Sequence, residues 1–208
     1  RFRRAGSTVV GVARERQLLG HVLVADQIRP TSAEAVAALK AMRIEPVMVS
    51  GDHPDTARAV AARLGIDDVI AGVLPQDKAR EVEARRAPGR IVGMAGDGIN
   101  DAPALAAADV SFALASGSGI AIDAADVTLM RNDLRSVCDA VDLSRRTVAK
   151  IRQNLFLAFI YNVLGIPLAA AGLLSPVIAG AAMALSSVSV VTNSLTLNRW
   201  RPARERKP

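Results

Sequence analysis

The sequence is poor in the residues that hold disulfide-linked domains and thiolate metal clusters together. Its 208 residues include one cysteine, Cys138, which excludes an internal disulfide and a cysteine-based metal cluster. Aromatic residues make up only 3% of the chain, with one tryptophan and one tyrosine. Nucleic-acid binding requires a basic face interleaved with aromatic side chains, so we expect no nucleic-acid partner despite the net charge of +6.

Charged residues are absent from two long stretches near the C-terminus, residues 155–174 and 177–197. Each stretch can cross about 30 Å of hydrocarbon as a helix, and only Ser175 and Pro176 separate the two. We therefore expect a tight transmembrane hairpin in the lipid bilayer; a buried helix pair in a soluble core is the alternative. Basic residues flank the hairpin, which predicts that both outer ends are cytoplasmic. They are Arg145, Arg146, Lys150 and Arg152 before the first stretch, and Arg199, Arg201, Arg204, Arg206 and Lys207 after the second.

Short apolar segments alternate with segments of helical period in the first 130 residues. This alternation is typical of a parallel sheet with helices on both faces. We expect an α/β fold with a Rossmann-like parallel sheet, and a long helix from Asp133 that leads into the hairpin. The predicted strands are two within 8–25, then 46–49, 69–71, 91–95, 110–114 and 127–130, and the predicted helices begin at Ser32, Pro54 and near Asp101.

Polar side chains gather where these predicted strands end. Ser50 ends one strand, Asp97 and Asp101 follow another, and Lys78 lies between them in the stretch PQDK. The carboxyl ends of strands are where open α/β sheets bind ligands. Two carboxylates can hold Mg²⁺, a lysine can offset the charge of a phosphoryl group, and a hydroxyl can position that group. The pattern predicts phosphoryl transfer; a simple helix cap is the alternative for the aspartates.

Three of these stretches, VSGD, PQDK and GDGINDAP, resemble motifs of the haloacid-dehalogenase superfamily in the version that P-type ATPases use. DQIRP and GDHPDTA resemble signatures of the same family, and the similarity extends from Thr8 to Arg199. The resemblance implies ATP as substrate and Mg²⁺ as cofactor, held by Asp97 and Asp101. It also implies catalytic roles for Ser50, Lys78, Asp97, Asn100 and Asp101, and binding roles for Gly51, Asp52, Gly96 and Gly98.

The sequence departs from the family in several places. Ser50 stands where threonine is usual, His53 where asparagine is common, and Gly119 where many relatives have an acid. DKTGT, which holds the phosphorylated aspartate of P-type ATPases, is absent from the 208 residues. We therefore expect the C-terminal portion of a longer pump, with the N-terminal part as its partner. A stand-alone phosphatase or regulatory module with Asp26 as nucleophile is the alternative.

The resemblance also predicts how the chain is divided. Residues 1–24 are expected to end a nucleotide-binding domain, 25–132 to form the phosphorylation domain, and 133–153 to form a connecting stalk helix. Residues 154–198 are the expected transmembrane hairpin, and 199–208 a basic cytoplasmic tail. The whole is expected in the plasma membrane as part of a multi-pass protein, with the phosphorylation domain in the cytoplasm.

Two membrane stretches, YNVLGIP and MALSS, resemble the paired signatures of copper-type P-type ATPases. They place Tyr161, Asn162, Met183 and Ser187 within the apolar runs. A thioether suits soft Cu(I), and would be a poor ligand for Mg²⁺ or Ca²⁺. We expect these four residues to contribute to a Cu(I) path, most simply for export, with a copper chaperone as a further partner. Hydrogen bonding to a neighbouring helix is the alternative role for such polar groups.

Overall fold

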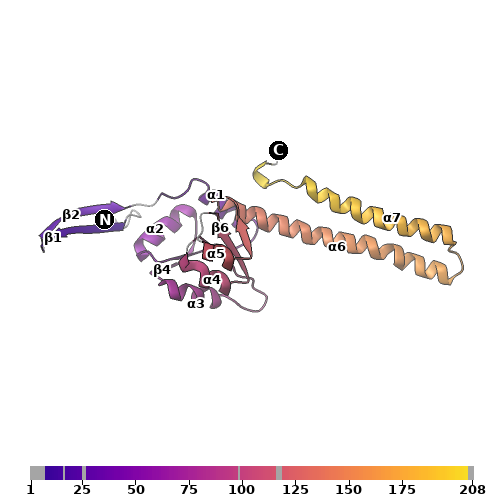
Figure 1. The fold of residues 1–208 in the computed structure, drawn as a ribbon, viewed down its shortest axis with the longest axis horizontal. Coiled ribbons are helices and arrows are strands. Elements are labelled where there is room, and N and C mark those ends of the chain that lie inside the picture. The colour runs from indigo at the N-terminus through magenta and orange to yellow at the C-terminus, as the bar shows by residue number, and fades with distance from the viewer. Residues whose placement is uncertain (1–7, 16, 25–26, 98, 116–118, 206–208) are drawn as a thin grey trace. The chain divides into compact units, whose positions relative to one another are not determined.

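The computed structural model describes residues 8–205 apart from 16, 25–26, 98 and 116–118. By its internal contacts the chain forms two compact units, Arg1–Cys138 and Asp139–Pro208. The strands and the shorter helices belong to the first unit, and a helical hairpin makes up most of the second (Figure 1).

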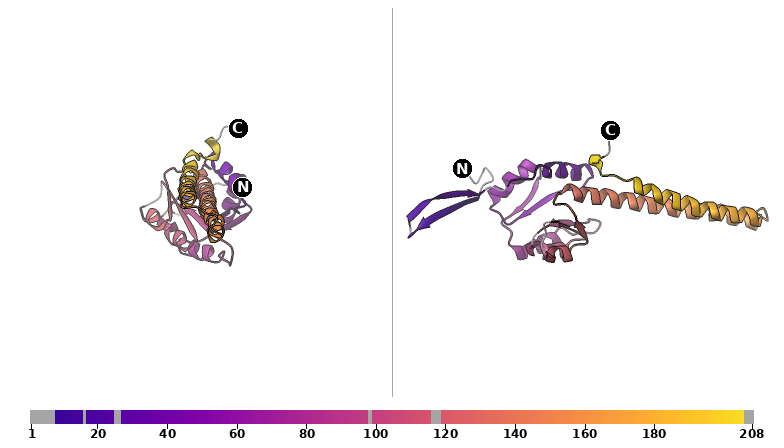
Figure 2. Two further views of the ribbon diagram at one scale, coloured as in Figure 1. Left: turned by 90° about the vertical axis from the view of Figure 1, so that its right-hand side faces the viewer. Right: turned by 45° about the horizontal axis from the view of Figure 1, so that its top comes forward.

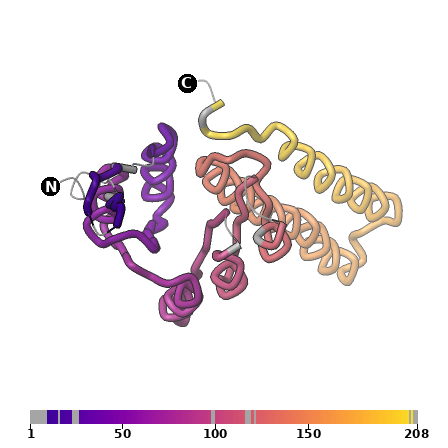
Figure 3. Tube along the Cα trace, turned by 60° about the vertical axis from the view of Figure 1, so that its left-hand side comes forward, coloured from indigo at the N-terminus to yellow at the C-terminus, as the bar shows by residue number. Residues whose placement is uncertain are grey.

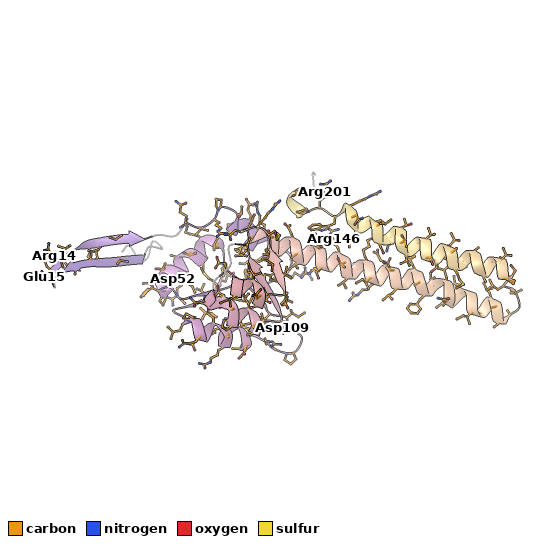
Figure 4. All side chains as sticks on the ribbon, viewed as in Figure 1. Arg14, Glu15, Asp52, Asp109, Arg146 and Arg201 are labelled. Atoms are coloured by element: carbon orange, nitrogen blue, oxygen red, sulfur yellow. The ribbon has the colours of Figure 1, made fainter. Side chains whose placement is uncertain are left out.

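A two-stranded ribbon begins the described chain. β1 (Thr8–Arg14) pairs antiparallel with β2 (Gln17–Val24), as predicted, and Figure 4 places Arg14 and Glu15 at the tip of the ribbon. Apolar side chains of both strands are exposed, among them Leu19 at 62%. An isolated two-stranded ribbon is at best marginally stable in water, so this ribbon needs further structure to cover it.

The first of two parallel sheets joins β3 (Val47–Ser50) to β4 (Asp68–Ala71). α1 (Ser32–Ala41) precedes β3, and α2 (Pro54–Leu64) connects the two strands. α2 ends at Gly65, whose φ of 73° lies in the left-handed region that glycine tolerates best. The helical period of this stretch and its terminal glycine therefore predicted α2 correctly.

The second parallel sheet has the strand order β5-β6-β7. β6 is its buried centre, where Phe112 and Ala113 are 7% and 0% exposed. Beyond the strands, α4 contributes the buried Leu105 to this core. The elements of this part are η2 (Pro75–Asp77), α3 (Lys78–Glu83), β5 (Gly93–Gly96), η3 (Ile99–Asp101), α4 (Ala102–Ala107), β6 (Val110–Leu114), α5 (Gly119–Ala124) and β7 (Val127–Leu129).

The predicted α/β fold with parallel strands is confirmed, but its strands lie in two sheets in place of one. In the described part of the chain, no strand pairs with the second edge of β3 or of β5. β3 is half-buried along its whole length, whereas strands of parallel sheets are usually buried on both faces. Packing of α3 against α4 connects the two parts. In the described part of the chain, β3 and β5 therefore each lack a neighbouring strand on one edge, and β3 also lacks full burial of its faces.

The hairpin consists of α6 (Arg135–Ala170) and α7 (Pro176–Leu195), which lie side by side in both views of Figure 2. Both helices are long and apolar enough to span a membrane, and their apolar windows are not buried in the protein. The trace in Figure 3 follows α6 through the turn into α7. Short turns of 3₁₀-helix follow, η4 (Thr196–Arg199) and η5 (Ala203–Glu205).

The turn of the hairpin precedes Ser175 and Pro176, the two residues that were expected to form it. The first helix ends at Ala170, and Gly172 turns the chain with a φ of 71°. Ser175 is the N-cap of α7, because its Oγ accepts a hydrogen bond from the backbone N–H of Ile178 (3.3 Å). Pro176 is the first residue of α7, a position where its missing N–H costs nothing. Ser175 and Pro176 therefore start the second helix and do not form the turn.

Candidate functional site

The residues predicted from the strand ends come from both parallel sheets. Ser50 is the last residue of β3, and Asp97 directly follows β5. Lys78 is the first residue of α3, and Asp101 is the N-cap of α4. Asn100 lies between the two aspartates in η3 and is exposed. Two further predicted residues, Asp26 and Gly98, lie outside the described residues.

An ion pair joins Lys78 to Asp101. Lys78 Nζ lies 2.7 Å from Asp101 Oδ1, and the two side chains are only 17% and 12% exposed. Water screens such a pair weakly, so the attraction between the two charges is stronger than in an ion pair at the surface. The sequence predicted Asp101 as a Mg²⁺ ligand and Lys78 as the residue that offsets phosphoryl charge. The structure places the two side chains in direct contact, from separate βα units.

Gly96 permits this arrangement by allowing close approach to Asp101. A Cβ atom built on Gly96 would lie 2.8 Å from Asp101 Cβ and 3.0 Å from its Oδ2, closer than real side chains approach. The last residue of β5 must therefore lack a side chain for Asp101 to keep its position. This packing role is additional to the ligand-binding role that the family resemblance implies for Gly96.

The loop after β3 is organised by Ser50 and Asp52. Ser50 Oγ donates to Asp52 Oδ2 (2.8 Å) and accepts from the Asp52 backbone N–H (3.1 Å). The loop is tied to the segment after β4, since the Val73 N–H donates to the Ser50 carbonyl at 3.1 Å. A Cβ on Gly51 would lie 3.3 Å from the Val73 carbonyl oxygen, so little space is left there. Figure 4 shows Asp52 in this loop.

The sequence predicts that Asp97 and Asp101 hold Mg²⁺, and the surroundings of the two side chains can be compared with what that cation requires. Among the described residues, no group of three or more His, Cys, Asp or Glu side chains is placed to hold a metal. Asp97 is exposed, and Asp101 is nearly buried beside Lys78. Mg²⁺ commonly takes one or two carboxylates and completes its shell with water and substrate phosphate. The two aspartates therefore fit this cation, with Asp97 as the more accessible ligand.

A second polar cluster, which the sequence did not reveal, joins the segment before α1 to the start of α6. Arg135 donates from Nε (2.9 Å) and NH2 (2.8 Å) to Asp133 Oδ2 and pairs with Glu34 at 3.0 Å. Thr31 Oγ1 donates to Asp133 Oδ1 (3.1 Å). Arg29 also donates to the Asn132 carbonyl. Only the fold brings these segments together, because they lie about a hundred residues apart.

Hydrogen bonds from the Arg135 side chain, the Arg135 backbone N–H and Thr31 together lower the pKa of Asp133 to about 2, against the opposing effect of burial. A depressed folded-state pKa stabilises the fold above the ordinary value of 3.8, and this stabilisation is lost as the pH falls towards 2. We expect the contribution to be about 1–2 kcal/mol. A hydrogen bond donated by the Val92 N–H likewise lowers the pKa of Asp109, and hydrogen bonds donated by the Ser111 hydroxyl and N–H lower the pKa of Asp126.

Replacement of Asp133 should therefore change how stability depends on pH. Between pH 4 and pH 2, Asp133→Asn should lose about 1–2 kcal/mol less unfolding free energy than the wild type. Denaturant unfolding of the chain in detergent, followed by circular dichroism, measures this difference. Asp123→Asn, at an exposed position of α5, is the control and should follow the wild type. Parallel curves for Asp133→Asn and the wild type would contradict the prediction.

The four membrane residues of the sequence analysis do not converge within the hairpin. Tyr161 faces α7, with its hydroxyl 3.5 Å from Ser189 Oγ. Asn162 donates to the Ala158 carbonyl of its own helix (3.0 Å), and Ser187 to the Met183 carbonyl (3.2 Å). Asn162, Met183 and Ser187 are all exposed, Met183 at 72%. These three are therefore available to structure outside the hairpin, whereas Tyr161 contributes to its interior.

The comparisons with known proteins agree with this combination of features. The family model for haloacid dehalogenase-like hydrolases matches residues 1–109. Among solved structures, a zinc-transporting PIB-type ATPase in the E2·Pi state superposes with a TM-score of 0.83 at 36% identity. That match covers 94% of this chain and 32% of the ATPase.

Curated relatives are more similar in sequence. The "Copper-exporting P-type ATPase" of Bacillus subtilis is 52% identical over 194 residues, 93% of this chain and 24% of its own length. The "Probable copper-importing P-type ATPase A" of Enterococcus hirae is 52% identical over 197 residues, 94% of this chain and 27% of its own length. The chain thus spans about a quarter of the length of these relatives. It belongs to the haloacid dehalogenase-like hydrolase family, and over nearly its whole length it is homologous to part of the copper-transporting P-type ATPases.

Proposed function

We propose that this chain is the C-terminal portion of an ATP-driven heavy-metal pump that transports Cu(I). The proposal depends on the observation that two features occur in one chain. One is the nearly buried Lys78–Asp101 pair at the strand ends, and the other is a pair of helices long enough to span a membrane. The first feature suits phosphoryl transfer, and the second gives that reaction a membrane process to drive. A stand-alone phosphatase would have no use for the hairpin.

β3 and β5 each have one edge with which no strand of the described residues pairs, and this supports the view that the phosphorylated aspartate belongs to another segment of the pump. Ser50 and Asp97 lie at the ends of these two strands. A further parallel strand that paired with both would end beside them, because carboxyl ends of parallel strands meet at one edge of the sheet. We propose that this strand precedes the present chain and bears the nucleophile. The exposed apolar side chains of β1 and β2 suggest, in the same way, that the ribbon completes a nucleotide-binding domain.

In the proposed reaction, the aspartates hold Mg²⁺, which would neutralise charge on the substrate phosphates. The Lys78 ammonium offsets the charge that develops on the transferred phosphoryl group, and it is held in place by Asp101. Ser50 Oγ and the N–H groups of its loop position the phosphoryl oxygens, with Gly51 and Asp52 shaping the loop. Asn100 and Gly98 complete the loop after β5. ATP is the proposed phosphoryl donor.

For the transported ion, we propose Cu(I) bound in part by Tyr161, Asn162, Met183 and Ser187. Exposed Met183 offers the soft sulfur that Cu(I) prefers. The outward direction of Asn162 and Ser187 suits a site that other membrane helices of the pump complete. We propose export as the direction, as the Bacillus subtilis relative is named, although an importer is equally similar. A copper chaperone stays a prediction of the family resemblance.

The chain by itself tests the pump against the phosphatase alternative. Without a nucleophile on the neighbouring strand, Mg²⁺ and a lysine cannot form a phosphoenzyme. The purified 208 residues should therefore hydrolyse neither ATP nor p-nitrophenyl phosphate above a no-enzyme blank. Robust turnover that is lost in Asp26→Asn but kept in Asp123→Asn would instead establish the phosphatase.

A further inference from the structure

A continuous line of residues joins α6 and α7 along the hairpin. On α7, half-buried positions recur every three or four residues, which is the spacing of one helix face. On α6, half-buried positions recur in the same way, so each helix shows one face to the other. This seam comprises Asn154, Leu157, Ala158, Tyr161 and Gly165 on α6, and Ala179, Ala182, Ser186, Ser189, Val190 and Asn193 on α7.

The seam has an apolar half and a polar half. Near the turn its residues are small, which lets the two helix backbones approach closely. Towards the open end, where the chain enters α6 and leaves α7, the seam is held by hydrogen bonds between side chains. Tyr161 and Ser189 mark the boundary between the two halves.

Asn193 is the centre of the polar half. Its Oδ1 accepts from Lys150 Nζ (2.8 Å), and its Nδ2 donates to Asn154 Oδ1 (2.8 Å). Asn154 in turn donates from Nδ2 to Ser194 Oγ (2.7 Å). The same Asn193 Nδ2 also lies 3.4 Å from Gln153 Oε1. Each amide of the Asn154–Asn193 pair thus both donates and accepts, so a shifted α7 could not keep these bonds.

A second contact extends the seam beyond the helices. Trp200 Nε1 donates to Asp142 Oδ2 (2.9 Å), and the same carboxylate accepts from Arg146 at 3.0 Å. Figure 4 shows Arg146 on α6 and Arg201 after η4 at this open end of the hairpin. The open end is therefore the strongly specified part of the hairpin, since small residues alone would allow the helices to slide or rotate.

Rotation of α7 would matter for Met183 and Ser187. A slip of one residue along a helix moves a side chain by 1.5 Å and turns it by about 100°. Both residues are exposed and lie off the seam, and the Ser187 hydroxyl bonds to the Met183 carbonyl of its own helix. Their direction thus depends on how α7 is seated on α6.

We propose that Asn154 and Asn193 are positioning residues that fix the register of α7 on α6 and thereby aim Met183 and Ser187 at the transported ion. This proposal rests on the proposed function, because it takes these two side chains to be part of the ion path. Neither asparagine contacts the ion; each acts through the helix that bears the ligands.

The test is the dependence of ATPase rate on Cu(I) concentration in the reconstituted full-length pump. Asn154→Ala and Asn193→Ala should each raise the Cu(I) concentration for half-maximal rate about tenfold, since misaimed ligands bind the ion less well. The maximal rate should stay within about twofold, because the phosphoryl-transfer residues are untouched. The shift in the double variant should be smaller than the two single shifts combined, because both changes remove the hydrogen bond from Asn193 to Asn154. Asn198→Ala, an exposed asparagine in η4, is the matched control and should behave as the wild type.

Unshifted half-maximal Cu(I) concentrations, or additive shifts in the double variant, would overturn the positioning role. If an alanine variant does not fold, Asn193→Asp is used with the same criteria, because it keeps the acceptor for Lys150 and removes the donor to Asn154. A wild-type pump without Cu(I) stimulation would overturn the copper assignment and this proposal together. A stimulated wild type with unshifted variants would overturn the proposal alone.

Discussion

Replacement of Asp97 by asparagine should lower phosphoenzyme formation by about 10²-fold or more in the full-length pump, through loss of a charged Mg²⁺ ligand. Asp97 is the better of the two aspartates for this experiment, because its side chain is exposed and bonds no described residue in the fold. Asp101→Asn would also remove the partner of a nearly buried ammonium, and breaking such a pair costs about 3–5 kcal/mol of stability. A loss of function there would therefore not separate folding from chemistry.

The measurement is the amount of acid-stable phosphoprotein formed from radiolabelled ATP. Asp123→Asn, an exposed aspartate of α5, is the control for a change of one surface charge. Raising the Mg²⁺ concentration should restore part of the phosphoenzyme in Asp97→Asn, since a weakened site still binds at higher concentration. Phosphoprotein at the wild-type level would remove Asp97 from the metal site.

Lys78→Ala should slow phosphoryl transfer by about 10²–10³-fold. The ammonium is held by Asp101 where phosphoryl charge would develop, and it is only 17% exposed, so water replaces it poorly. Single-turnover phosphorylation with saturating ATP measures this step apart from ATP binding. The rate is normalised to the folded fraction, measured by circular dichroism, because Lys78→Ala also takes the ammonium away from the nearly buried Asp101.

The chain offers a close control for this change. Lys40 Nζ also lies 2.7 Å from a carboxylate, Asp67 Oδ2, but the two side chains are 42% and 92% exposed. Lys40→Ala removes an ion pair of the same length at the surface, where such pairs contribute little. It should leave the rate unchanged. Equal rates for Lys78→Ala and the wild type would reduce Lys78 to a structural residue.

Local pattern predicted much of the fold, because the elements concerned depend on neighbouring residues. Gly65 and the helical period before it defined α2, and the charge-free runs defined the hairpin. The turn was misplaced because Ser175 and Pro176, which look like turn residues, are also a favourable N-cap and first helical residue. The division of the parallel strands into two sheets, β3-β4 and β5-β6-β7, could not be predicted, because strand pairing depends on contacts between segments that are distant in the sequence.

The candidate site was predictable to a similar extent. The motifs brought Lys78 and Asp101 into one site, and the structure pairs them. The steric clash that a Cβ on Gly96 would make with Asp101 depends on three-dimensional packing, so it could not be predicted from the local sequence. Asp133 and Arg135 looked like an ordinary helix start, because their partners Thr31 and Glu34 lie a hundred residues away.

The metal dependence of ATPase activity in the full-length pump identifies the transported ion. The structure that superposes with a TM-score of 0.83 is a zinc transporter, whereas the 52%-identical relatives are named for copper. We expect stimulation by Cu(I) and none by Zn²⁺. Met183→Ala should weaken the Cu(I) stimulation, and Met130→Ala, an 87% exposed methionine outside the hairpin, should not. Stimulation by Zn²⁺ and not by Cu(I), or full Cu(I) stimulation in Met183→Ala, would contradict the account.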